Sequence, residues 1–95
     1  MDQIEVQAIL NQVKEMFREA GFLEVDIRNE TLFEKNGYYH RFSSVEGMKG
    51  FIIETAISLK DAENNLFEDS DFYSFSLGNS KILSEIQRDI EKYYT

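Results

Sequence analysis

The sequence contains no cysteine, which excludes disulfide bonds, thiolate catalysis and zinc or iron–sulfur sites with cysteine ligands. It also contains no proline, no internal repeat and no low-complexity tract. No apolar run approaches the roughly 20 residues of a membrane-spanning helix, and the acidic start MDQIEVQ is unlike a signal peptide. The sequence therefore predicts a cytoplasmic protein, with residues 1–95 forming a single domain around one core.

Basic residues are scarce as well. The 10 lysines and arginines are outnumbered by 18 aspartates and glutamates, which leaves a formal net charge of −8 at pH 7. Such a surface repels nucleic-acid phosphates and anionic lipid headgroups, so neither nucleic acid nor membrane is predicted as a partner. The same field attracts a basic protein and speeds the encounter with it. The alternative interpretation is that the charge serves solubility alone.

Recognisable catalytic motifs are absent too. There is no Gly-x-Ser-x-Gly motif and no glycine-rich phosphate loop, and GMKG at 47–50 is interpreted as a turn. The one histidine, His40, shares a face with Tyr38 and Phe42, which favours a structural role over that of a catalytic base. We therefore expect no enzyme and no cofactor. A small metal-dependent enzyme using His40 and nearby carboxylates is kept as an alternative.

Two segments have the apolar spacing of amphipathic helices. The first is predicted over 3–20, with Asp2 and Glu5 as a capping box and Gly21 at its end. Its stripe consists of Val6, Ile9, Leu10, Val13, Phe17 and Ala20. The second begins at Ser80, expected to be its N-cap. Its predicted buried stripe consists of Ile82, Leu83, Ile86, Ile90 and Tyr93.

The segments between these helices predict strands. Residues 22–28 alternate, with Leu23, Val25 and Ile27 on one face. Asn36-Gly37 predicts a type I′ hairpin turn between strands near 31–35 and 38–43, followed by a loop over 43–50. Residues 51–59 are apolar on both faces, which is typical of a central strand.

After this central strand, two turns of helix are expected from Ser58, using Leu59, Ala62 and Leu66 as apolar residues, and then a short strand near 72–77. The sequence thus predicts an α+β fold. It has an antiparallel sheet of four to five strands, with the N- and C-terminal helices on one face and the other face partly open.

The segment from Asp61 to Leu77 stands out because five acids fall within eleven residues without a base, interleaved with aromatics. It does not fit a calcium-binding EF-hand loop, since Leu66 or Ser74 stands where the turn glycine is needed. If Phe67 and Phe75 are buried, alternation puts Tyr73 on their side and Phe72 on the other. Aromatic anchors among carboxylates are typical of an interface with a basic protein. The predicted partner-binding residues are Asp61, Glu63, Glu68, Asp69, Asp71, Phe72 and Tyr73.

The stretches FIIETA, KDAENNLFEDSDFYSFSL and EIQRDIEKYY resemble small acidic α+β immunity proteins of bacterial polymorphic toxin systems. The similarity covers roughly the C-terminal half of the chain. It implies a cytoplasmic protein that occludes the active site of a cognate toxin, with Glu68, Asp69, Asp71, Phe72 and Tyr73 at the positions of the shared motif. A structural or oligomerisation domain, with the open sheet face closing a homodimer, is the remaining alternative.

Overall fold

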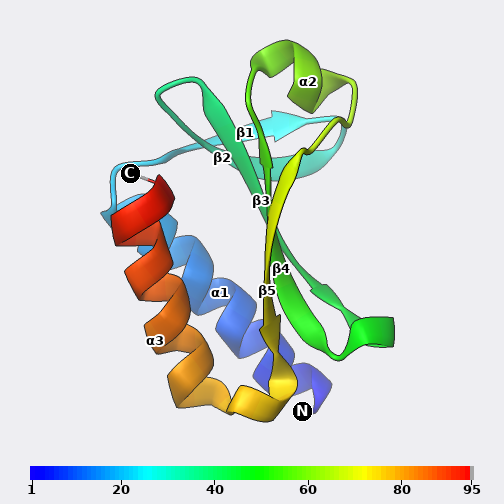
Figure 1. Cartoon of the computed structure of the whole chain (residues 1–95), viewed down its shortest axis with the longest axis vertical. Coiled ribbons are helices and arrows are strands. Elements are labelled where there is room, and N and C mark those ends of the chain that lie inside the picture. The colour runs from blue at the N-terminus through cyan, green and yellow to red at the C-terminus, as the bar shows by residue number, and fades with distance from the viewer. Residues whose placement is uncertain (95) are drawn as a thin grey trace.

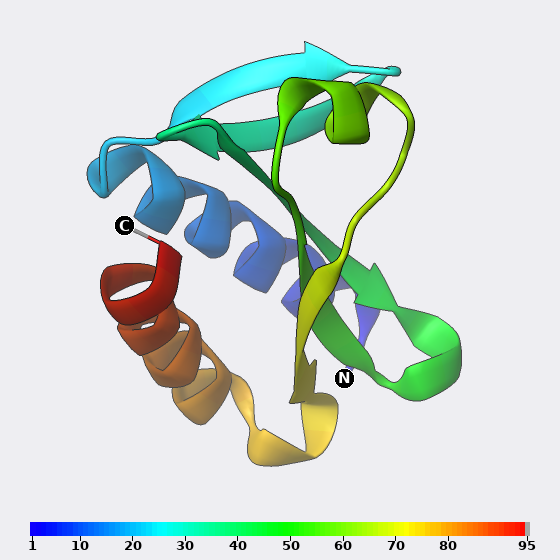
Figure 2. The same cartoon turned by 45° about the horizontal axis from the view of Figure 1, so that its top comes forward.

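The chain folds into one antiparallel sheet with a helix from each end of the chain on the same face (Figures 1 and 2). The structure is a computed structural model and describes residues 1–94. The predicted α+β class is confirmed. In chain order the elements are α1 (Gln3–Glu19), β1 (Leu23–Ile27), β2 (Glu30–Lys35), β3 (Tyr38–Val45), β4 (Gly50–Ala56), α2 (Leu59–Glu63), β5 (Asp69–Ser74) and α3 (Asn79–Asp89), which continues as a π-helical turn, η3 (Ile90–Tyr94).

The local signals of the N-terminal half form the elements they predicted. Asp2 and Glu5 make the capping box of α1, and Val6, Ile9, Val13 and Phe17 are its buried residues. Asn36 and Gly37 both have positive φ, as a type I′ turn requires, and they join β2 to β3. The loop expected from residue 43 starts later, because β3 pairs with β4 as far as Val45.

The strands follow one another in the sheet in sequence order, so β1 and β5 are the two edges. The registers Phe33↔His40, His40↔Thr55 and Thr55↔Asp69 place these four residues in one row across the sheet. His40 contacts the ring of Phe17 on α1, so this row faces the helices. The register thereby connects the only histidine to the acidic edge strand.

Three elements in the C-terminal half have boundaries that differ from the prediction. β4 ends at Ala56 rather than near residue 59, and β5 spans Asp69–Ser74 rather than 72–77, because residues 69–74 pair with β4 and residues 75–77 form a 3₁₀ turn. The acids Asp69 and Asp71 therefore lie in a strand and not in a loop. α3 begins at Asn79 after Gly78 (φ 83°), so Ser80 is not its N-cap.

The main core lies between the sheet and the two long helices. It contains the predicted stripe of α1 and, except for Tyr93, that of α3, together with Phe33, Phe51, Ile53 and Tyr73. Tyr93 was expected in this core but is 65% exposed, and Tyr94 packs against the core instead. The reason is the π-helical turn η3, whose wider turn shifts the last residues around the helix axis.

The other sheet face is only partly covered. α2 and the segment after it close one end over a small cluster of Leu32, Ala56 and Ala62, with Phe67 packed against it. Phe67 therefore lies on the opposite side from Tyr73, contrary to the prediction, whereas Phe72 is on this outer face as expected. Leu59, Leu66 and Leu23 were predicted to be buried but are largely exposed. None of the helices within residues 1–94 has the length and apolar composition needed to cross a membrane.

Candidate functional site

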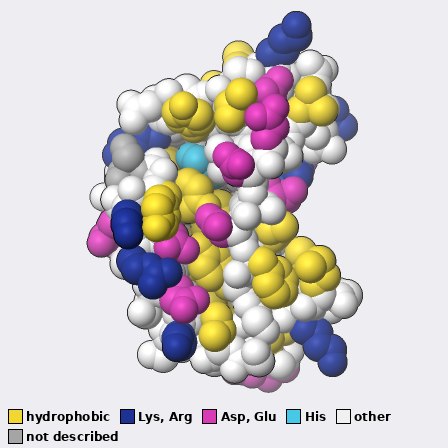
Figure 3. All heavy atoms as spheres, viewed as in Figure 1, with side chains coloured by type: hydrophobic (Ala, Val, Ile, Leu, Met, Phe, Trp, Pro, Cys, Tyr) yellow, Lys and Arg dark blue, Asp and Glu magenta, His cyan; other side chains and the backbone are white. Residues whose placement is uncertain are grey.

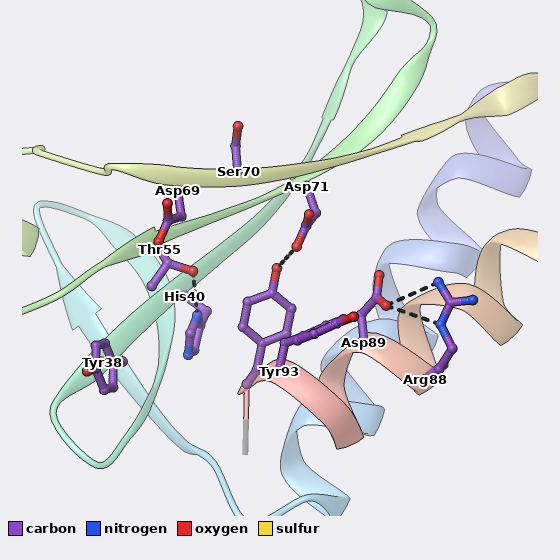
Figure 4. Close-up of a pocket in the computed structure, with 10 residues that line it drawn as sticks. Tyr38, His40, Thr55, Asp69, Ser70, Asp71, Arg88, Asp89 and Tyr93 are labelled. Atoms are coloured by element: carbon purple, nitrogen blue, oxygen red, sulfur yellow. Dashed lines mark hydrogen bonds and ion pairs between the residues drawn. The ribbon is translucent and has the colours of Figure 1, made fainter.

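A cleft of about 600 Å³ opens on the helix-facing side of the sheet, between the edge strand β5 and the C-terminal turn η3 (Figure 4). Three distant parts of the chain bring it together: the strands β3 and β4, the strand β5, and the end of α3 with η3. Its lining residues are Tyr38, His40, Thr55, Asp69, Ser70, Asp71, Arg88, Asp89, Tyr93 and Tyr94. The cleft therefore combines carboxylates and tyrosines around the one histidine.

The carboxylates of the cleft come from β5 and α3. Alternation along β5 turns Asp69 and Asp71 toward the helices, and Figure 4 shows Ser70 pointing the opposite way. The Asp71 carboxylate accepts a hydrogen bond from the Tyr94 hydroxyl. The Asp69 carboxylate, which also lines the cleft, has no hydrogen bond or ion pair within residues 1–94. Asp69 is thus a negative charge available to a ligand.

Asp89 is the buried acid of the cleft, at 7% exposed. Its Oδ2 accepts a hydrogen bond of 2.6 Å from the Tyr73 hydroxyl, and its Oδ1 is 3.2 Å from the Arg88 guanidinium. Burial, together with the hydrogen bond to Asp89, raises the pKa of Tyr73 well above its usual value. The phenol therefore stays protonated and donates to the carboxylate. This contact and the Tyr94–Asp71 bond fasten the C-terminal turn to β5.

His40 forms the inner wall of the cleft. Its Nδ1 is 2.9 Å from the Thr55 hydroxyl, and its ring packs against Phe22 and against Tyr94, with ring centroids 5.5 and 4.8 Å away. Its Nε2 is buried and has no hydrogen-bond partner within residues 1–94. Burial lowers the pKa of His40 to about 4, so the imidazole is neutral at pH 7.

The arrangement of these groups also bears on metal binding. Within the part of the chain that the structure describes, no three His, Asp or Glu side chains gather closely enough to hold a metal ion. His40 Nε2 is closed off from solvent. What the cleft offers chemically is therefore a set of hydrogen-bond acceptors and aromatic rings, which suits a guanidinium or ammonium group.

The structure places the predicted partner-binding residues in the cleft, on the opposite side of the sheet, at the start of β5 and in the core. Asp69 and Asp71 line the cleft, whereas Asp61 and Glu63 lie on α2 at the other face of the sheet, with Glu68 exposed just before β5. Phe72 is 44% exposed on that outer face. Tyr73 is only 3% exposed, so the structure corrects its assignment as a surface anchor: its ring belongs to the core and its hydroxyl to Asp89.

Several cleft residues were missed by the sequence analysis. Asp89, Tyr93 and Tyr94 come from the C-terminal helix and turn, more than ten residues away from β5 in sequence. The adjacent tyrosines at the end of the last helix were the available signal, but only Tyr93 was given a role, as part of the buried stripe. Their juxtaposition with Asp69 and Asp71 depends on the packing of α3 against the sheet.

The comparisons with known proteins add no identification. The chain matches none of the protein-family models, curated proteins or solved structures with which it was compared. The similarity to immunity proteins therefore stays a prediction.

Proposed function

We propose that this protein is a non-catalytic binding module for a basic protein, of the immunity type that neutralises a cognate toxin in the cytoplasm. The observation that carries the proposal is the tyrosine-lined cleft in which the carboxylate of Asp69, on the edge strand, has no ion pair within residues 1–94. The net charge of −8 supports it, because long-range attraction between opposite charges raises the association rate.

The cleft has the chemistry that a basic side chain requires. A guanidinium group can donate two parallel hydrogen bonds to a carboxylate such as that of Asp69, while its flat face stacks on a tyrosine ring. Tyr38 and Tyr93 are the exposed rings of the cleft, at 48% and 65% exposed. Arginine and tyrosine are both enriched among the few interface residues that contribute most of the binding energy.

Such a surface would inhibit an enzyme that acts on an anionic substrate. The active site of such an enzyme is lined by cations, and a protein that offers carboxylates in place of the substrate's charges competes for the same groups. Neutralisation would then need no chemistry from the acidic protein, only occupation of the basic cleft.

The test starts with affinity capture of the partner from a lysate of the cells in which the protein occurs, followed by purification of the captured protein. Association rates are then measured at about 50 mM and about 500 mM NaCl, where the screening length falls from about 14 to about 4 Å. We expect association to slow by about tenfold or more at the higher salt concentration. We also expect the activity of the captured protein to fall in proportion to the complex formed.

A matched pair of variants distinguishes the contribution of the cleft carboxylates to binding from that of the overall negative charge. Asp69→Asn/Asp71→Asn removes two charges from the cleft, whereas Asp61→Asn/Glu63→Gln removes two charges from α2. We expect about tenfold weaker binding for the first variant and less than about twofold for the second. Equal effects of the two variants, or a captured protein whose activity is unchanged in the complex, would contradict the proposal.

A further inference from the structure

We infer that the free edge of β5 is the docking strand of this module, and that it accepts an extended segment of the partner as an added antiparallel strand with alternating basic and apolar side chains. The inference rests on the proposed function and specifies how the partner is held. Addition of a strand to a sheet edge gives affinity through backbone hydrogen bonds and specificity through alternate side chains.

The topology leaves this edge without a partner. β5 pairs only with β4, and no other strand lies beside it within residues 1–94. In Figure 1, β5 is drawn in front of β4, and the space-filling view from the same side shows carboxylates interleaved with hydrophobic side chains along the middle of this face (Figure 3). The edge is therefore reachable along its length.

The register identifies the backbone groups that are on offer. The N–H of Phe75 donates to the carbonyl of Lys49, which continues the constant β4–β5 register. In an antiparallel ladder, hydrogen-bonded residues alternate along the strand, so Asp69, Asp71 and Tyr73 bond toward β4. The N–H and C=O groups of Ser70, Phe72 and Ser74 then point outward, toward an incoming strand.

The side chains of β5 determine the pattern of the incoming strand. Asp69 and Asp71 face the cleft, so partner residues on that side meet carboxylates and tyrosines and should be basic. On the opposite face, Phe72 is 44% exposed, so partner residues on that side should be apolar. An added strand that alternates arginine with an aliphatic residue satisfies both faces at once.

The same charges disfavour a second copy of this chain as the occupant. Two β5 strands paired antiparallel about a two-fold axis would bring the aspartates of both copies onto one face, close together. Like charges facing each other across strands are destabilising. Inward-facing charges are a known means of preventing edge-to-edge association, so β5 rejects its own copy and favours a basic strand.

The probe is a capped octapeptide that alternates arginine and valine, added to the protein in about 20 mM NaCl, where screening is weak. In the proposed geometry the valines lie opposite Ser70, Phe72 and Ser74, so valine N–H groups bond to β5 and arginine N–H groups point away. A peptide N-methylated at the valines and a peptide N-methylated at the arginines are therefore a matched pair.

We expect the unmodified peptide and the arginine-methylated peptide to bind, and the valine-methylated peptide to bind about tenfold more weakly or worse. Hydrogen exchange of the Ser70, Phe72 and Ser74 amides should slow by about tenfold on binding, because exchange requires an open amide. Asp69→Asn/Asp71→Asn should weaken binding by about fivefold or more, and Asp61→Asn/Glu63→Gln by less than about twofold.

Equal affinities for the two methylated peptides would overturn strand addition, as would the absence of binding at millimolar peptide concentration or an unchanged exchange rate at β5. The proposed function fails separately. Suppose that a captured basic partner loses affinity for the Asp69→Asn/Asp71→Asn variant while the β5 amides stay unprotected in the complex. That result would support the proposed binding module and contradict strand addition at β5.

Discussion

The buried histidine gives the most quantitative prediction. His40 is 2% exposed, and its imidazole is hydrogen-bonded to Thr55. In the folded state its pKa is about 4, against 6.5 in the unfolded chain, because burial penalises the charged ring. As the pH falls below 6.5, the unfolded state takes up a proton that the folded state does not bind. The free energy of unfolding must therefore fall with pH, down to the folded pKa.

The size of this effect follows from the difference in pKa. A difference of 2.5 units at about 1.4 kcal/mol per unit gives about 3 kcal/mol, most of it lost between pH 7 and pH 4. The total stability of a domain of this size is about 5–15 kcal/mol. The proton uptake of a single side chain thus removes a substantial part of the stability in mildly acidic solution.

The assay is urea unfolding at a series of pH values for the native chain and for His40→Gln. Glutamine keeps a polar group near Thr55 but does not titrate in this range, and the carboxylates titrate in both proteins. We expect the stability of the native chain relative to the variant to decrease by about 3 kcal/mol from pH 7 to pH 4. Parallel curves for the two proteins, or an imidazole titration by NMR with a midpoint near 6.5, would refute the reasoning.

Two further predictions concern packing around β5. In Gly50→Ala the added Cβ would lie 2.3 Å from the Phe72 ring and 2.8 Å from the Tyr73 carbonyl oxygen, so the free energy of unfolding in urea should fall by about 1–3 kcal/mol. Gly47→Ala is the control, because nothing lies within 4 Å of the Cβ added there. Equal losses for the two variants would contradict the packing argument. Tyr73→Phe leaves the buried Asp89 without its phenol donor and should cost about 1–3 kcal/mol at pH 7. Since the raised Tyr73 pKa makes the native chain lose stability above pH 10, the variant should lose less there, and identical alkaline unfolding would count against this.

The part of the fold that could be predicted depends on contacts between near neighbours in sequence. The capping box of Asp2 and Glu5 closes within one helical turn, and Asn36-Gly37 supplies positive φ without help from the rest of the chain. The helix stripes and the alternation of β5 around Tyr73 also follow from backbone geometry alone. The absence of cysteine likewise excludes disulfide bonds and cysteine-ligated metal sites from the composition alone, and the net charge of −8 is also fixed by composition.

The cleft belongs to the tertiary structure. Its carboxylates and tyrosines come from β5 and the C-terminal turn, and they meet only because α3 packs its isoleucine stripe against the helix-facing side of the sheet. Tyr94 packs against the core in place of the predicted Tyr93 because Ile90–Tyr94 form a π-helical turn. Such turns are rare and are not predicted from local helix propensity.

Whether an alternating strand is central or at an edge, and which of its faces meets the helices, is decided by partners far away along the chain. The sequence by itself determined that two acids and two aromatics, Asp69, Asp71, Phe72 and Tyr73, fall within five residues. Only packing decided that Tyr73 is buried, and that within residues 1–94 Asp69 has no ion pair and the outer edge of β5 has no neighbouring strand. The reason is that burial is a property of the assembled layers and not of any single segment.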